Sequence, residues 1–256
     1  MNITNLPLCN YSLGEWLVFS AVLGTLVYAS ILDVRSRDIP EITWLPASII
    51  ALAVNLMYGN YDLMHTVFSL VPSAIVLIMA FLGLMGGADS LALLMVGIAF
   101  PKFLVVPISL LTLIYSLIPP IILMIYYLIV NVTVNRKVFK VINCTEGKFA
   151  KYLLPLLGRP ISVEKYLMGR FIYPLTIPLG NSEFICRTYF GDDDEEEKVR
   201  KGIEELVRAG VLRPNDKIIV TPALPHILFI LIGFIIATLT PQLWLARLIY
   251  SVIIHH

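Results

Sequence analysis

Six long apolar stretches constrain this chain more than any other feature of its sequence. About 20 apolar residues in a row are enough to cross the hydrocarbon core of a bilayer as a helix. With 58% hydrophobic and only 14% charged residues, the chain is far more apolar than a soluble domain of its length. The sequence therefore predicts an α-helical polytopic membrane protein with about six transmembrane helices, near residues 13–32, 41–58, 64–85, 90–106, 107–134 and 225–250.

Prolines interrupt two of these stretches. We expect the fourth helix to be short, because Gly97, Pro101 and Lys102 lie within its stretch. Pro119-Pro120 should kink the fifth helix, because proline removes a backbone donor and clashes with the preceding turn. The first stretch has no basic segment before it, so we interpret it as a retained helix and not as a signal peptide.

The region from 136 to 222 differs from the rest, with charged residues and prolines in place of long apolar runs. Apolar residues recur at helical spacing over 195–209, with Gly210 as a stop, and 217–221 has the composition of a short strand. We therefore predict three parts. They are a transmembrane core with helices 1–5 (1–135), a small soluble α+β domain (136–222), and a final transmembrane helix with the C-terminus (223–256).

The distribution of charge indicates an orientation in the membrane. Arg35 and Arg37 directly follow the first predicted helix, and 15 of the 19 basic residues fall between 136 and 217. Basic residues favour cytoplasmic loops. We therefore expect a multi-pass protein of the cytoplasmic membrane with its soluble domain on the cytoplasmic side. The same count of spans brings Asp33 and Asp89 to that face, where they could share one site.

Asp33 and Asp89 each lie where an apolar stretch meets a polar turn. A bare carboxylate in hydrocarbon is costly, so each must be hydrated, paired or used in chemistry. Two carboxyls that hold one water, one ionised and one protonated, form the dyad of an aspartyl protease. Gly86-Gly87, just before the second aspartate, would let backbone approach an extended substrate. The alternative is that each aspartate is only a boundary or N-cap residue.

Other kinds of site find little support. The cysteines Cys9, Cys144 and Cys186 form no metal-binding pair, and we expect Cys144 and Cys186 to be free thiols. The four histidines show no ligand spacing. We therefore predict no metal and no cofactor. Residues 136–217 hold 15 basic and 12 acidic residues, a balance that does not suggest nucleic-acid binding.

Two motifs resemble those of a known family. Asp33, followed six residues later by Ile39-Pro40 and then Glu41, resembles the first motif of the type IV prepilin peptidases. Gly86-Gly87-Ala88-Asp89 is similar to their Gly-x-Gly-Asp motif, and 56 residues separate the two aspartates. The archaeal branch, the preflagellin peptidases, resembles this chain most. Ser90-Leu91 departs from the bacterial pattern, in which a lysine follows the second motif.

The resemblance implies a membrane aspartyl endopeptidase without metal. It would remove the short basic leader of a preflagellin or pilin-like protein at the cytoplasmic face, with that substrate and the lipid bilayer as partners. Asp33 and Asp89 would together activate the water. The residues expected to contact substrate are Gly86, Gly87 and Ala88 beside its backbone, and Asp38 and Glu41 near its basic leader.

Two alternatives stay open. A presenilin-like intramembrane protease shares the Gly-x-Gly-Asp logic and carries a later Pro-Ala-Leu element, which Pro222-Ala223-Leu224 matches in what we interpret as coincidence. A proton-coupled transporter also uses intramembrane acids and broken helices. For the protease we further expect that the dyad closes only when substrate arrives, because Gly86-Gly87 offers a hinge and the short fourth helix offers weak anchoring.

Overall fold

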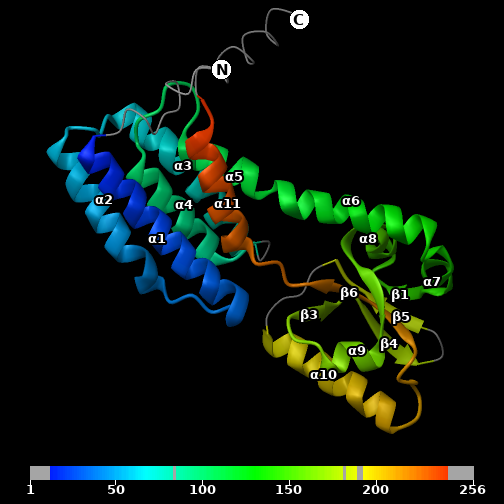
Figure 1. Cartoon of the computed structure of the whole chain (residues 1–256). Coiled ribbons are helices and arrows are strands. Elements are labelled where there is room, and N and C mark those ends of the chain that lie inside the picture. Colours follow the sequence, from blue (N-terminus) through cyan, green and yellow to red (C-terminus); the bar gives the residue numbers. More distant parts are fainter. Residues whose placement is uncertain (1–11, 83–84, 181–182, 189–192, 242–256) are drawn as a thin grey trace, which may run out of the picture. The chain divides into compact units, whose positions relative to one another are not determined.

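The computed structural model describes residues 12–82, 85–180, 183–188 and 193–241 (Figure 1). The chain divides into two compact units. We call the first, which comprises Met1–Pro119 and Pro225–His256, the helical unit. We call the second, Pro120–Leu224, the mixed unit.

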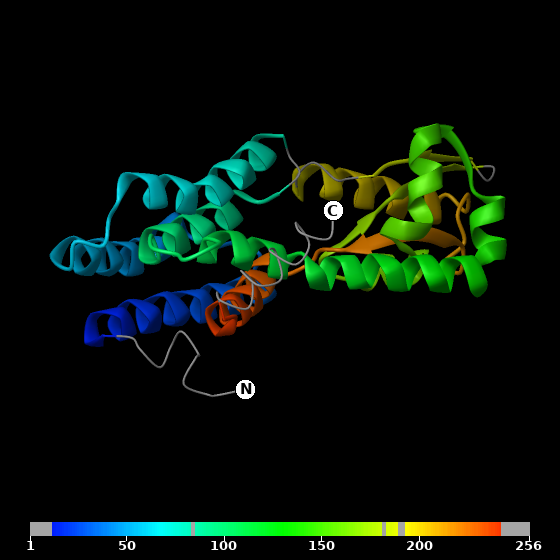
Figure 2. The same cartoon turned by 90° about the horizontal axis from the view of Figure 1, so that it is seen from above.

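The helical unit is an assembly of apolar helices (Figures 1 and 2). Within it α11 packs against α1, α4 and α5, while α3 packs against α4 and α5. Ser12 starts α1 with a capping box, since its Oγ accepts from Glu15 N–H while Glu15 Oε2 accepts from Ser12 N–H. The elements are α1 (Leu13–Arg35), η3 (Glu41–Trp44), α2 (Leu45–Met57), α3 (Leu63–Phe81), α4 (Gly87–Ala99), α5 (Ile108–Ser116) and α11 (His226–Leu239).

Glycines allow two of these helix pairs to approach closely. A Cβ at Gly97 of α4 would lie 2.5 Å from the backbone oxygen of Ser69 in α3. A Cβ at Gly233 of α11 would lie 2.5 Å from the backbone oxygen of Thr112 in α5. Small residues at such crossings are the usual way in which membrane helices pack without a hydrophobic driving force between them.

The structure contains three helices that are long and apolar enough to cross a membrane, by length and composition, within its described residues. These candidate spans are Leu13–Arg35, Leu63–Phe81 and Ile108–Thr133. Glu41–Met57, Gly87–Ala99 and His226–Leu239 are shorter apolar helices. The membrane character is therefore confirmed, whereas the count of six spans stays a prediction. The part of the last predicted span after residue 241 lies outside the described residues.

The predicted interruptions are present. α4 ends at Ala99, just before Pro101, and is therefore short as expected. The third candidate span is divided into α5 and α6 (Ile118–Thr133) at Leu117. Pro119 and Pro120 fall in the first turn of α6, where a missing N–H leaves no helical hydrogen bond unmade. The prolines thus begin a new helix and do not bend a continuous one.

The mixed unit combines helices with two small three-stranded sheets of order β1-β5-β4 and β2-β6-β3. The predicted α+β composition is therefore confirmed, with the expected helix at α10 and the expected strand at β6. Gly210 ends the turn after α10 with a φ of +74°. The further elements are α7 (Arg136–Val141), β1 (Asn143–Glu146), α8 (Lys148–Leu157), β2 (Arg159–Ser162), α9 (Val163–Met168), β3 (Ile172–Pro174), β4 (Thr176–Gly180), β5 (Glu183–Cys186), α10 (Asp193–Arg208) and β6 (Lys217–Pro222).

The expectation of free thiols at Cys144 and Cys186 is wrong. The two residues form a disulfide, with their Cα atoms 5.6 Å apart. They lie on β1 and β5, which pair in parallel, so the sheet brings together cysteines that are 42 residues apart in sequence. Both side chains are buried in the core of the mixed unit, with Ala150, Leu154 and Ile219.

Candidate active site

Asp33 is a buried carboxylate in the last turn of α1, with a residue exposure of 8%. Arg37 follows the helix end in the left-handed conformation, with a φ of +60°. This conformation is costly for a residue with a side chain. It turns the chain so that Arg37 Nη1 comes back to within 3.4 Å of Asp33 Oδ1. The backbone of Arg37 is thus strained next to an ion pair, and strained backbone of this kind is typical of functional sites.

Asp89 lies in the first turn of α4 and is 5% exposed. Its Oδ2 accepts a hydrogen bond from the N–H of Gly86 at 3.3 Å, which satisfies one of the free donors at the helix start. The next residue, Ser90, exchanges two hydrogen bonds with Ser73 of α3, from Ser73 Oγ to Ser90 O at 2.9 Å and from Ser90 Oγ to Ser73 O at 3.1 Å. These bonds argue against the expected weak anchoring of Asp89.

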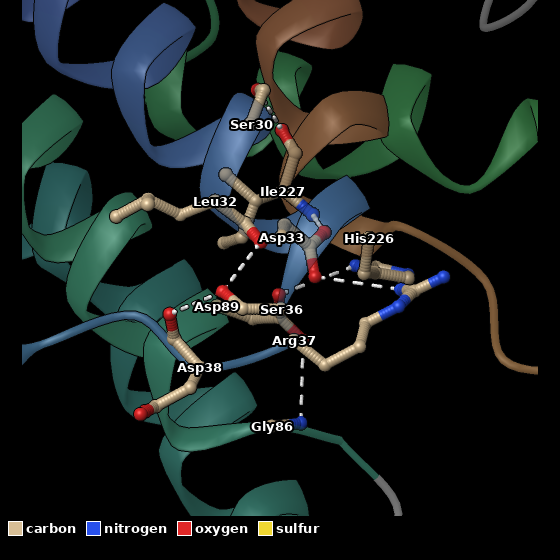
Figure 3. Close-up of polar contacts among 10 residues, drawn as sticks. All are labelled: Ser30, Leu32, Asp33, Ser36, Arg37, Asp38, Gly86, Asp89, His226 and Ile227. Carbon is tan, nitrogen blue, oxygen red and sulfur yellow. Dashed lines mark hydrogen bonds and ion pairs between the residues drawn. The ribbon is translucent and has the colours of Figure 1, made fainter. Parts of the chain in front are cut away.

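The start of α11 meets both carboxylates. Ile227 N–H donates to Asp33 Oδ2 at 3.0 Å. His226 Nδ1 lies 3.6 Å from Asp89 Oδ1. Figure 3 shows Asp33 and Asp89 on the same side of this helix start, with Arg37 reaching Asp33 from below. Residues from the two ends of the helical unit's sequence therefore converge on one buried acidic pair.

The electrostatic surroundings of Asp33 combine one acidic and two basic neighbours. Its carboxyl lies near the negative charge of Asp89, the positive charge of Arg37 and the imidazole of His226. Neighbouring carboxylates repel each other unless they share a proton or are neutralised. The two acids, with a cation and an imidazole beside them, are the kinds of group that acid–base chemistry on a water molecule requires.

The structure separates the predicted substrate residues into two groups. Gly86, Gly87 and Ala88 lie directly before Asp89, at the start of α4, and the two glycines are exposed. Asp38 and Glu41 are exposed in the segment after α1. The contact recorded for Asp38 is made by its backbone oxygen, which accepts from Ser36 Oγ at 3.3 Å. The structure therefore places the glycines at the acidic pair, and it records no contact of Asp38 or Glu41 with either aspartate.

Sequence reasoning missed the contribution of α11. In the sequence His226 shows no metal-ligand spacing, and Ile227 acts through its backbone, which carries no sequence signal. The available signal was a polar residue at the start of an otherwise apolar helix, directly after Pro225. No group of three or more His, Cys, Asp or Glu residues that could hold a metal ion was found among the described residues.

Comparison with known families gives two matches. Residues 20–131 match the Type IV leader peptidase family, and this range contains both aspartates. Residues 150–240 match a second family, Archaeal Peptidase A24 C-terminus Type II, and this range contains His226. No curated protein and no solved structure matches the chain.

Proposed function

Because the chain belongs to the type IV leader peptidase family, in its archaeal branch, we propose that it is an aspartic endopeptidase with Asp33 and Asp89 as its catalytic pair. The observation that carries this assignment is the convergence of both buried carboxylates on the first turn of α11. Family membership supports leader-peptide cleavage as the reaction. The acidic pair supplies the chemistry for it.

In the proposed mechanism the two carboxyls hold one water between them. The ionised carboxyl takes a proton from the water while the water oxygen attacks the scissile carbonyl. The protonated carboxyl donates its proton to the carbonyl oxygen. The tetrahedral intermediate then collapses, and the carboxyl that took the water proton gives it to the leaving nitrogen, while the other carboxyl takes back its proton as the new carbonyl forms. The pair titrates as a unit, so the acid and base roles belong to the pair. No covalent intermediate and no metal takes part.

The proposed substrate is a preflagellin or pilin-like protein, whose short basic leader ends in Gly before an apolar helix. Its cleavage site must come close to Asp89. A Cβ placed on Gly87 would meet no atom of the described residues within 4 Å, so among these residues space lies open beside this backbone. We place the extended leader there and the apolar helix of the substrate in the bilayer.

The test is cleavage of a purified preflagellin by the purified chain in detergent, with the product identified by mass. We expect a cut directly after the leader's Gly, with or without EDTA. A cut inside the apolar segment would instead favour the presenilin-like alternative. Absence of cleavage together with proton-coupled uptake in liposomes would favour the transporter.

We further propose that the active site and the mixed unit are cytoplasmic. The charge bias after α1 supports this side. A cytoplasmic mixed unit that holds the Cys144–Cys186 disulfide would be unusual, because cytosolic disulfides are common mainly in hyperthermophilic organisms. Labelling of the Ser36→Cys variant with a membrane-impermeant reagent tests on which side of the membrane this residue lies. Modification from outside intact cells would overturn the proposal.

A further inference from the structure

Two neighbouring residues of α11 each contact one aspartate. The backbone N–H of Ile227 binds Asp33 Oδ2, and the imidazole of His226 faces Asp89 Oδ1 at 3.6 Å. Both residues belong to one helical turn, so their relative positions are fixed. The separation of the two carboxyls therefore depends on this turn (Figure 3).

His226 Nδ1 is buried and makes no hydrogen bond within the part of the chain that the structure describes. The side chain is 22% exposed, and that of Asp89 is 8% exposed. The ring of Phe229 packs edge-on against the imidazole, with centroids 6.2 Å apart. A buried polar nitrogen without a hydrogen-bond partner is destabilising, because it has lost its hydration and gained no bond in return. A movement of roughly 0.5 Å would bring the Nδ1–Oδ1 distance into hydrogen-bond range.

We propose that His226 is a positioning residue of the acidic pair. Its Nδ1–H donates to Asp89 Oδ1 in the working enzyme and fixes the direction of that carboxyl, as Ile227 N–H fixes the carboxyl of Asp33. The proposal rests on the proposed function. The charged groups around the imidazole are Asp89 on α4, Asp33 on α1 and Arg37 beyond the end of α1.

The experiment compares His226→Ala and His226→Gln with wild type in the cleavage assay, measuring kcat and KM separately. Misplacing a catalytic group by about 1 Å can cost up to roughly 100-fold in rate. We therefore expect kcat of His226→Ala to fall roughly 10- to 100-fold with little change in KM. Free imidazole should restore part of the lost rate in His226→Ala, and His226→Gln, which retains a donor, should lose less.

His65→Ala is the matched control. His65 also pairs with an aspartate, since its Nδ1 lies 2.9 Å from Asp62 Oδ2, but this pair is exposed at the start of α3. We expect His65→Ala to retain the wild-type kcat. Wild-type kcat in His226→Ala would overturn the proposal, and so would a loss that neither imidazole nor glutamine reduces.

Asp33→Asn and Asp89→Asn are assayed in parallel. If they are active, the proposed function fails, whereas if they are inactive and His226→Ala is normal, only the role of His226 fails.

A separate observation concerns a basic stretch of the mixed unit, residues 136–159, which forms α7, β1 and α8 and begins β2. Residues 136–159 contain six basic residues and one acidic residue, Glu146. On α8, Phe149 is 75% exposed and Tyr152 is 81% exposed, while Ala150 and Leu154 on the other side are buried in the core. The basic residues are Arg136, Lys137, Lys140, Lys148, Lys151 and Arg159. We call this the basic aromatic surface.

This surface adjoins the end of a candidate membrane span. The span Ile108–Thr133 stops three residues before α7 begins. Asn131 in the last turn of α6 donates to the backbone oxygens of Pro155 at 2.9 Å and Gly158 at 2.6 Å, which fixes the end of α8 beside that turn. Basic clusters next to a span attract anionic headgroups, and aromatic side chains favour the membrane interface.

From this arrangement we infer that the basic aromatic surface binds anionic lipid headgroups at the membrane surface where α6 ends. The test is hydrogen exchange of α8 in the full chain, in nanodiscs of phosphatidylglycerol and of phosphatidylcholine. We expect slower exchange of α8 in phosphatidylglycerol. High salt should remove the difference, because it screens exposed charges.

Lys148→Gln with Lys151→Gln should abolish the difference between the two lipids. The matched control is Lys165→Gln with Lys198→Gln, which removes the same charge from exposed positions on α9 and α10 and should leave the difference intact. Equal exchange of α8 in both lipids would overturn the inference. Protection by a short DNA duplex but not by phosphatidylglycerol would also overturn it, because the surface would then recognise nucleic acid.

Discussion

The backbone N–H of Ile227 donates to Asp33 Oδ2 at 3.0 Å, although 194 residues separate the two in sequence. This bond ties the last described helix to the end of the first. Together with His226 it makes the geometry of the acidic pair depend on α11. A chain that lacks α11 would therefore retain both aspartates but lose one contact of each.

Arg37 should matter for activity and Arg35 should not. Arg37 Nη1 lies 3.4 Å from Asp33 Oδ1, so Arg37→Gln leaves a buried carboxylate without its cation. We expect kcat/KM to fall roughly tenfold or more, the scale of one charge-assisted hydrogen bond. Arg35→Gln, two residues earlier and exposed, is the control. Equal effects of the two substitutions would contradict a specific role for Arg37.

Two glycines of α4 should respond differently to alanine. Gly87→Ala adds a methyl group to open space, so unfolding should be unchanged while substrate approach is hindered and KM rises. Gly97→Ala places its Cβ 2.5 Å from Ser69 O, which should destabilise the helical unit by about 1–3 kcal/mol. Thermal unfolding and cleavage kinetics of both variants separate the two effects. A stable, fully active Gly87→Ala enzyme would remove both the proposed approach path and the hinge.

The disulfide should stabilise the mixed unit. It closes a loop of 42 residues, and loops of this length give roughly 2–4 kcal/mol. The double variant Cys144→Ser with Cys186→Ser should unfold at a lower temperature than wild type. A reducing agent should lower the unfolding temperature of the wild-type chain. Cys9→Ser is the control and should have no effect. An unfolding temperature that is insensitive to reductant would mean that the bond does not form.

Alkaline pH should destabilise the mixed unit through Tyr166. Burial raises the pKa of Tyr166 above its ordinary value, and the neighbouring Glu196 raises it further. The unfolded chain therefore loses this proton at about pH 10, while the folded unit still retains it. Stability is thus full below about pH 10 and is lost as pH rises towards the folded pKa. Tyr166→Phe should flatten this dependence in unfolding measured by circular dichroism. An unchanged slope would show that other groups cause it.

Local patterns predicted local structure well. The apolar spacing before Gly210 predicted α10, and Pro101 predicted the early end of α4, because these features depend on neighbours in sequence. Pro119-Pro120 predicted a kink, whereas the structure has a break between α5 and α6 there. The disulfide and the contact between His226 and Asp89 could not be predicted in this way. Cys144 and Cys186 meet only because β1 and β5 pair, and His226 reaches Asp89 only because α11 packs against α1 and α4.

The central claim is that Asp33 and Asp89 act as one water-activating unit. The most direct measurement is the cleavage rate of Asp33→Asn, Asp89→Asn and the double variant, with Asp38→Asn as the control and correct folding checked by circular dichroism. Residues that act as a unit are strongly non-additive. We predict that each single variant loses activity as completely as the double variant does, while Asp38→Asn retains most of it. Substantial cleavage by either single variant, or losses that simply multiply in the double variant, would contradict the account.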